Sequence, residues 1–257
     1  VTGITATAER YSASSAHVTF CAEDEWGLLG DTGYLLRTAE QFHWVNDAYD
    51  SFDDFLSALV SRKRKAIRKE RRTAVAGGAI TFRTLEGPQI TEDDWDAFFE
   101  FYMDTGRRKW GTPYLNRKFF QLIGDRMADD IVLVLADHSG TPIAGALNFK
   151  GGGVLYGRYW GATRALRHLH FNVCYYAAVE YCIAAGLGRF EPGAGGNYKQ
   201  LRGFDPQPTR SAHFLRDPRL AQAVGEFLRA ERDQVTETID WYRERSALKK
   251  EAPVGSA

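Results

Sequence analysis

The chain has 257 residues, 44% apolar and 26% charged, which allows one large globular domain or two smaller ones with a real core. Its 33 basic and 33 acidic side chains balance, so net charge favours no class of partner. Three cysteines without a CxxC pair exclude a disulfide framework and predict a reducing, cytoplasmic location. No apolar run reaches the ~20 residues that would span a bilayer.

The first third of the chain alternates short strands and helices. Residues 17–20 and 34–46 are predicted strands, and 23–33 is a predicted short helix closed by glycine. Apolar residues then recur at helical spacing from Phe52 to Val75, so we expect one helix there. Ser51 is its predicted N-cap, and Gly77-Gly78 ends it.

The rest of the chain predicts a mixed sheet with helices on both faces. Over residues 79–245 the expected order is β-α-α-β-β-β-α-β-β-α. Its strands are 80–87, 131–137, 143–150, 154–162, 189–194 and 208–215, and its helices are 91–106, 116–130, 172–186 and a long one from Asp217. We therefore expect a partial first half at 1–78, a complete module at 79–245 and a flexible tail at 246–257.

Several long segments resemble one bacterial family. They include SFDDFLSALVSRKRKAIRKERR, RKWGTPYL, IAGALNFKGGGVLYGRYWGA, HLHFNVCYYAAVEYCIAAGLGRFEPGAGG and RGFDPQPTRSAHFLRDPR. They are similar to predicted N-acyltransferases labelled as peptidoglycan biosynthesis or recognition proteins, which are related to Fem-type aminoacyl transferases. The resemblance implies an α/β fold of the GNAT acyl-CoA N-acyltransferase type, with two such halves in tandem. Here one module is complete and the preceding one is partial.

The resemblance has one clear departure. Members of the family usually carry a Gln-Gly-Glu-His-Lys type of run where this chain has Gly195-Gly196-Asn197-Tyr198-Lys199. Lys199 is kept, but an acid and a histidine are replaced. This loss favours an alternative function, a non-catalytic binding module of the same fold that holds RNA or a cell-wall precursor.

Five polar or aromatic residues gather at the ends of two predicted strands, where open α/β sheets bind ligands. They are Tyr156, Arg158, Trp160, Glu191 and Lys199. An acyl transfer needs a base for the amine and a group that stabilises the oxyanion. Glu191 is the expected base, or else an ion-pair partner of Arg158 or Arg202. His170 and Tyr156 complete the candidate catalytic set.

The donor site is predicted from a near-match to a pyrophosphate-binding loop. Arg158-Tyr-Trp-Gly161-Ala-Thr163 follows a strand and precedes a buried helix, as a Q/R-x-x-G-x-G/A run would. Acyl-CoA is then a co-substrate, and no cofactor is tightly bound. The predicted substrate or cofactor site consists of Arg158, Trp160, Gly161, Lys199, Arg202 and Trp110. An exposed strand end is the alternative interpretation of the loop.

The run from Arg62 to Arg72 is the strongest charge feature, with eight cations among eleven residues. Such a surface suits phosphates of nucleic acid, of a nucleotide-linked sugar or of a membrane, whereas an ordinary solvated helix face is the alternative. The predicted polyanion-binding residues are Arg62, Lys63, Arg64, Lys65, Arg68 and Lys69. His168 and His170 form an H-x-H without a third ligand at useful spacing, so no metal site is predicted.

Taken together, these features predict an N-acyltransferase. It would pass an acyl or aminoacyl group from a thioester or a charged tRNA directly to an amine in a ternary complex. Its partners would be a small acyl donor, an amine acceptor, and tRNA or a nucleotide-linked cell-wall precursor. The sequence leaves the donor, the acceptor and the oligomeric state open.

Overall fold

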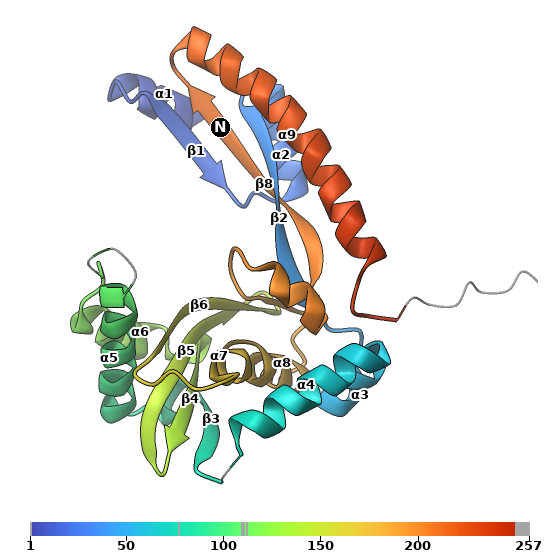
Figure 1. Ribbon diagram of the computed structural model, residues 1–257. Helices are drawn as coiled ribbons and strands as arrows, with labels where there is room; N and C mark the ends of the chain where they lie inside the picture. Colours follow the sequence, from blue (N-terminus) through green and yellow to red (C-terminus); the bar gives the residue numbers. More distant parts are fainter. Residues whose placement is uncertain (1, 77, 109–110, 112, 250–257) are drawn as a thin grey trace, which may run out of the picture. The chain divides into compact units, whose positions relative to one another are not determined.

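The computed structural model describes residues 2–76, 78–108, 111 and 113–249. The chain forms two compact units (Figure 1). Unit 1 contains residues 1–41 and 205–246, and unit 2 contains residues 42–204 and 247–257. The predicted tandem halves with a boundary at residue 78 stay a prediction, and most of the expected tail lies outside the described residues.

Unit 2 contains a mixed sheet in the order β7-β6-β5-β4-β3, with the end of β2 (Leu35–Val45) beside β7. Its other strands are β3 (Ile80–Glu86), β4 (Ile131–His138), β5 (Thr141–Gly151), β6 (Val154–Ala162) and β7 (Arg189–Glu191). Strands β3 to β6 are antiparallel neighbours, whereas β6 and β7 run parallel. The predicted α/β fold with a mixed sheet is confirmed.

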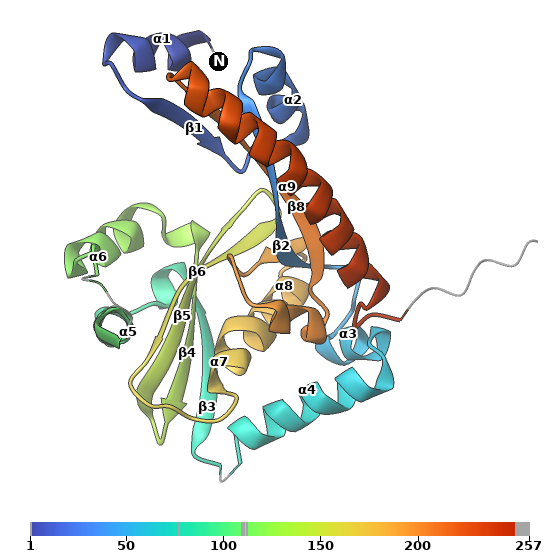
Figure 2. The same ribbon diagram turned by 45° about the horizontal axis from the view of Figure 1, so that its top comes forward.

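Helices cover both faces of this sheet (Figure 2). On one face lie α5 (Glu92–Arg108) and α6 (Arg117–Arg126). On the other lies a continuous helical segment made of α7 (Leu169–Phe171), the π-helical turn η3 (Asn172–Tyr176) and α8 (Ala177–Ala184). Two short 3₁₀ turns complete this part of the chain: η1 (Gly87–Gln89) follows β3, and η2 (Ala128–Asp130) precedes β4.

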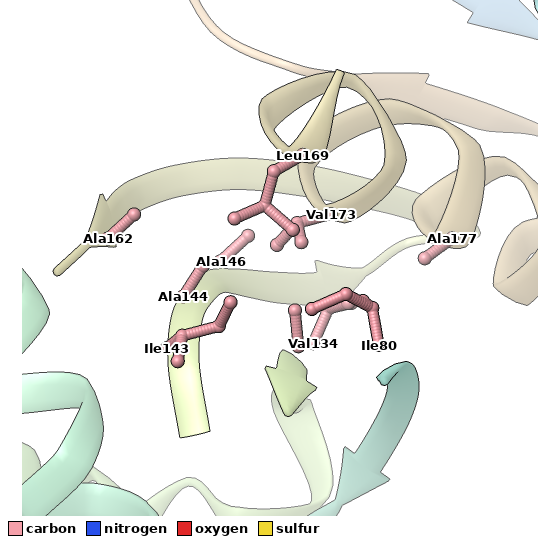
Figure 3. Packing of buried hydrophobic residues seen from close by; sticks show 10 residues of the cluster. Ile80, Val134, Ile143, Ala144, Ala146, Ala162, Leu169, Val173 and Ala177 are labelled. Carbon is pink, nitrogen blue, oxygen red and sulfur yellow. The ribbon is translucent and has the colours of Figure 1, made fainter. Parts of the chain in front are cut away.

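Alternation along β4 builds two separate cores. Leu133 and Leu135 face α5 and α6, whereas Val134 and Ala136 face the helical segment 169–184. Figure 3 shows the second core, in which Leu169, Val173 and Ala177 of the helical segment pack against the sheet, where several residues are alanine. Because β4 is covered on both faces, it reads in the sequence as an unbroken apolar run.

A cross-strand glycine pair lets α5 lie close to the sheet. Gly145 of β5 stands opposite Gly161 of β6. A Cβ atom at Gly161 would lie 2.2 Å from the carbonyl oxygen of Phe101, and one at Gly145 would lie 3.0 Å from the Phe98 ring. Gly161 is therefore required by packing against α5, which was not predicted from the sequence.

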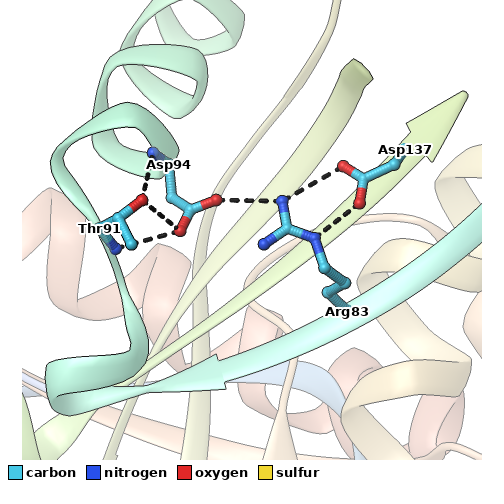
Figure 4. Close-up of polar contacts among 4 residues, drawn as sticks. All are labelled: Arg83, Thr91, Asp94 and Asp137. Carbon is cyan, nitrogen blue, oxygen red and sulfur yellow. Dashed lines mark hydrogen bonds and ion pairs between the residues drawn. The ribbon is translucent and has the colours of Figure 1, made fainter. Parts of the chain in front are cut away.

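The start of α5 is held by a charge cluster in which two buried carboxylates share one arginine (Figure 4). Arg83 of β3 donates from Nε to Asp137 at 2.6 Å and from Nη2 to Asp94 at 3.0 Å. Asp94 also accepts from the backbone N–H and the hydroxyl of Thr91. These Thr91 bonds and the Arg83 charge outweigh burial and lower the pKa of Asp94.

The single helix expected from Phe52 to Val75 is two helices. The prediction was wrong because α3 (Phe52–Ala58) ends at Leu59, whose extended backbone precedes α4 (Ser61–Ala74). Leu59 is fully buried, and Val60 donates its N–H to the carbonyl of Ala247, which takes the chain out of helical geometry. Ser51 caps α3 as predicted, accepting from the N–H of Asp54.

Unit 1 contains the strands β1 (Ser15–Thr19) and β8 (Asp205–Leu215) with the first part of β2. Its helices are α1 (Thr2–Arg10), α2 (Glu23–Asp31) and α9 (Pro218–Glu244). α9 begins as predicted, because Asp217 accepts from the first backbone N–H groups. Its apolar stripe is only partly buried, however: Leu228 is covered and Phe227 is 62% exposed.

Among the described residues, no helix is both long and apolar enough to cross a membrane.

Candidate functional site

A pocket of about 440 Å³ opens in unit 2 where β6 and β7 stop pairing. The two strands are in register only from Val154 to Tyr156 on β6. Beyond that point a bulge in the β5–β6 ladder inserts Arg158, and Pro192 ends β7. The lining of the pocket includes the β6 residues 157–160 together with Pro192 and Ala194.

Aromatic side chains form much of the pocket wall. Tyr114 and Tyr159 share a hydrogen bond of 2.6 Å between their hydroxyls, and Tyr175 and Tyr198 share one of 3.3 Å. Burial is the largest cause that raises the pKa of Tyr159 to about 12 and raises that of Tyr175 further. The phenols of Tyr159 and Tyr175 are therefore neutral near pH 7, and they supply apolar surface with hydroxyl groups at its edge.

Lys199 is the most unusual group in the pocket, since its side chain is only 2% exposed. It lies on the 3₁₀ turn η4 (Asn197–Arg202), which follows Gly195 and Gly196, both at positive φ. Its Nζ donates to the carbonyl of Gly193 at 2.5 Å. Burial lowers the pKa of Lys199 to about 8, so the amine is mostly a cation at pH 7 and loses its proton readily above it.

No carboxylate belongs to the described residues that line the pocket. Its ionisable nitrogen groups are Arg158, Lys199 and His170. His170 lies edge-on to Trp160, with ring centroids 4.8 Å apart. The pocket is therefore suited to a carbonyl oxygen or an anionic group rather than to a bare cation.

Arg202 holds the turn that carries Lys199. It donates to the carbonyl of Tyr198 at 2.8 Å and to the Tyr176 hydroxyl at 3.0 Å, and its guanidinium stacks 3.5 Å from the Phe171 ring. It also forms an ion pair with Glu70 of α4 at 2.8 Å. Arg202 is buried and is not among the described lining residues, unlike its predicted role as a ligand-binding group.

The structure separates the predicted catalytic residues. His170 lines the pocket, but Glu191 and Tyr156 are not among the described lining residues. Glu191 pairs with Arg189 at 2.8 Å, and its carboxylate lies 3.9 Å from the Nε2 of His43. The roles of Glu191 and Tyr156 therefore remain predictions that the position of the pocket does not support.

Most of the predicted binding residues that can be located are at the pocket. Arg158, Trp160 and Lys199 line it, whereas Gly161 packs against α5 and Trp110 lies outside the described residues. Sequence reasoning missed Tyr159 and Tyr175 of the wall, because a tyrosine in a helix or strand usually belongs to the core. It also missed Glu70, the only acid in the basic run, which lies three residues after the buried Ile67.

The cations of α4 fall into two groups. Arg68 pairs with Asp53 at 3.0 Å, Arg71 pairs with Glu180 at 2.6 Å, and Arg64 donates to a backbone carbonyl. Lys63 is half-buried, and burial is the first cause that lowers its pKa. Four exposed cations form no ion pair with the described residues, and we call them the outer stripe: Arg62, Lys65, Lys69 and Arg72.

The outer stripe follows one face of the helix, because its members are separated by three, four and three residues. At 1.5 Å per residue it is about 15 Å long.

Within the described part of the chain, no group of three or more His, Cys, Asp or Glu side chains could hold a metal ion. His168 has a left-handed backbone (φ 64°) before α7.

Comparison with known proteins gives one family and several similar folds. The FemAB-like family, described as peptidoglycan biosynthesis/recognition, matches residues 1–250. No curated protein matches the chain. The structure of L-PGS from Bacillus licheniformis is similar with a TM-score of 0.62 at 12% identity, covering 88% of this chain and 76% of that one.

Two further solved structures are similar at the same level. FemX has a TM-score of 0.59 at 13% identity, covering 87% of this chain and 77% of its own. The C-terminal domain of a putative lysylphosphatidylglycerol synthetase from Agrobacterium fabrum has a TM-score of 0.57 at 13% identity, covering 87% and 74%. At such identities these likenesses show a common fold.

Proposed function

Because the chain belongs to the FemAB-like family, described as peptidoglycan biosynthesis/recognition, we propose that it transfers an acyl or aminoacyl group to an amine in the pocket of unit 2. The observation that supports this proposal is the buried Lys199 in an aromatic pocket whose described lining has no carboxylate. Such a site fits the oxyanion that forms when an amine attacks an ester or thioester carbonyl.

The chemistry assigns distinct tasks to the groups in the pocket. Lys199 and Arg158 would attract the carbonyl oxygen of the donor as negative charge develops on it, and the aromatic wall would exclude water. His170 is the lining group that can accept the proton of the attacking amine. The new C–N bond forms as the C–O or C–S bond of the donor breaks, and the proton taken from the amine passes to the leaving alcohol or thiol, without a covalent enzyme intermediate.

For the donor, we favour an aminoacyl ester of tRNA over acyl-CoA. The glycine of the near-matching CoA loop is explained by its contact with α5, and Thr163 already donates its N–H to Ile143 of β5. The outer stripe on α4 offers four cations without ion pairs to described residues, spaced for a phosphate backbone. Acyl-CoA stays as the alternative donor.

For the acceptor, we favour a nucleotide-linked cell-wall precursor, in keeping with the family's description. Its carboxylate and phosphate groups would meet a pocket with two cationic side chains and no described carboxylate. A simple cationic amine would meet the same charges as repulsion.

A specific observation favours a second function, a binding module without catalysis. Glu191, the carboxylate expected to act as the base, is paired with Arg189 and lies outside the described lining. Turnover distinguishes the two functions, since a binding module needs no acyl donor.

The experiment is a transfer assay with labelled aminoacyl-tRNA and with acyl-CoA, each in the presence of a nucleotide-linked muropeptide. Transfer of label from the tRNA supports the proposal as stated, and transfer from acyl-CoA alone replaces its donor. Saturable binding of the muropeptide without transfer from either donor would overturn the catalytic proposal in favour of the binding module.

A further inference from the structure

The basic helix α4 and the turn that carries Lys199 are connected by one partly buried carboxylate. Glu70 lies on the face of α4 that also carries Ile67 and Ala74, opposite the outer stripe. Its two oxygens accept from the Nη2 and Nε of Arg202 at 2.8 and 3.2 Å. The hydroxyl of Tyr176 also donates to Glu70.

Arg202 connects Glu70 to Tyr198 of the pocket wall and to α7. Its Nη1 donates to the carbonyl of Tyr198, the residue before Lys199, and its guanidinium covers the ring of Phe171 in α7. Arg202 and Lys199 belong to the same 3₁₀ turn, so fixing one end of the turn fixes the other. The turn is preceded by two positive-φ glycines and followed by a third, Gly203, so its own backbone holds it weakly.

We propose that Glu70 is a positioning residue: acting through Arg202, it places Lys199 in the pocket and joins the pocket to the helix that presents the outer stripe. This inference deepens the proposed function, because the importance of placing Lys199 rests on that function. A phosphate polymer bound to the outer stripe and a substrate in the pocket would then be held by a single packed unit.

The test uses Glu70→Gln, which keeps the shape of the side chain and removes its charge. Cyanate modifies neutral amines, so the rate of Lys199 carbamylation against pH, read by mass spectrometry on the full chain, reports the pKa of Lys199. Lys118, an exposed lysine, is the internal reference. Asp53→Asn is the matched control, since it removes an exposed carboxylate that pairs with Arg68 of the same helix.

The sign of the change distinguishes positioning from charge alone. If Glu70 positions the turn, Glu70→Gln lets water reach Lys199, and the midpoint of its labelling curve rises from about 8 toward the ~10.4 of a free lysine. If only charge matters, the unpaired Arg202 cation repels the ammonium and the midpoint falls. An unchanged or lowered midpoint in a folded Glu70→Gln protein overturns the proposal, as does an equal rise in Asp53→Asn.

A second variant covers the case in which Glu70→Gln does not fold. Arg202→Lys keeps the charge but loses the planar fork, and the proposal expects the same rise in the Lys199 midpoint. In the double variant the two rises should not add, because both changes break one connection. Additive rises, or no rise in Arg202→Lys, would overturn it. The labelling needs no turnover, so the two proposals can fail separately. If Glu70→Gln raises the Lys199 midpoint but the wild type transfers no acyl group, the proposed function fails and the positioning inference stands.

Discussion

Replacing Arg83 by methionine should destabilise unit 2 more than any comparable loss of a surface arginine. The substitution leaves Asp94 and Asp137, which are 6% and 5% exposed, as two buried carboxylates without their cation. Removing one partner of a buried ion pair typically costs 3–5 kcal/mol. Because the Arg83 side chain is itself 38% exposed, we expect the lower end, about 3 kcal/mol.

The matched control is Arg117→Met. Arg117 also binds two carboxylates through its fork, Glu92 and Asp96, but these are 71% and 67% exposed and return to water when it is lost. We expect a loss of at most about 1 kcal/mol there. The assay is urea unfolding of both variants and the wild type, followed by tryptophan fluorescence and far-UV circular dichroism.

The free energy of unfolding should also depend on pH, in a direction set by the pKa of Asp94. The pKa of Asp94 is depressed in the fold, so its contribution to stability is present above the unfolded value of about 3.9 and is lost as pH falls through the folded value. In Arg83→Met the burial that raises the pKa of Asp94 is no longer offset by the Arg83 charge, so this carboxylate gains more from protonation. The difference between wild type and variant should therefore shrink from pH 7 to pH 4. Equal losses in the two variants, or a difference that does not change with pH, would refute this reasoning.

Three further predictions follow from the fold and the site. Gly161→Ala should cost about 1–3 kcal/mol in urea unfolding because its Cβ would meet the α5 backbone at 2.2 Å, whereas Gly151→Ala, with open space around it, should cost under ~1 kcal/mol; equal costs would contradict the close approach. Lys199→Met should stabilise the fold below pH 8, on the order of 1–3 kcal/mol, because the buried ammonium has a depressed pKa. That gain should fade between pH 8 and about 10.5 as the wild-type amine loses its proton, so a gain independent of pH would contradict burial as the cause. Changing the outer stripe to glutamine should weaken tRNA binding in a filter assay and lower the salt slope by about 3–4, whereas glutamine at the ion-paired Arg68 and Arg71 should change the slope by less than ~1; equal effects would place the RNA elsewhere.

The sequence predicted the order of strands and helices along the chain because the signals for them are local. Alternating and continuous apolar runs identify β3 to β6, and Ser51 and Asp217 mark the starts of two helices through cap chemistry. The break between α3 and α4 was missed because Leu59 and Val60 fit a helical apolar pattern. Only contact with the distant Ala247 shows that the chain leaves the helix there.

The candidate site was predicted in part for the same reason. The ends of β6 and β7 could be located from the sequence, and Arg158, Trp160, His170 and Lys199 do lie at the pocket. The ion-pair partners of Glu191 and Arg202 could not be predicted from the sequence. Glu191 pairs with Arg189, and Arg202 pairs with Glu70, which lies 132 residues earlier in the chain. Long-range ion pairs leave no periodic signal in a sequence.

The most direct test of the central claim is the initial rate of label transfer from aminoacyl-tRNA to a nucleotide-linked muropeptide by the wild type, Lys199→Met and Lys118→Met. If Lys199 stabilises the oxyanion, we predict transfer by the wild type, a loss of about 10²–10³-fold in Lys199→Met and full activity in Lys118→Met. Transfer that survives Lys199→Met unchanged would contradict the account of the pocket. Absence of transfer by the wild type with every donor would contradict the assignment as a transferase.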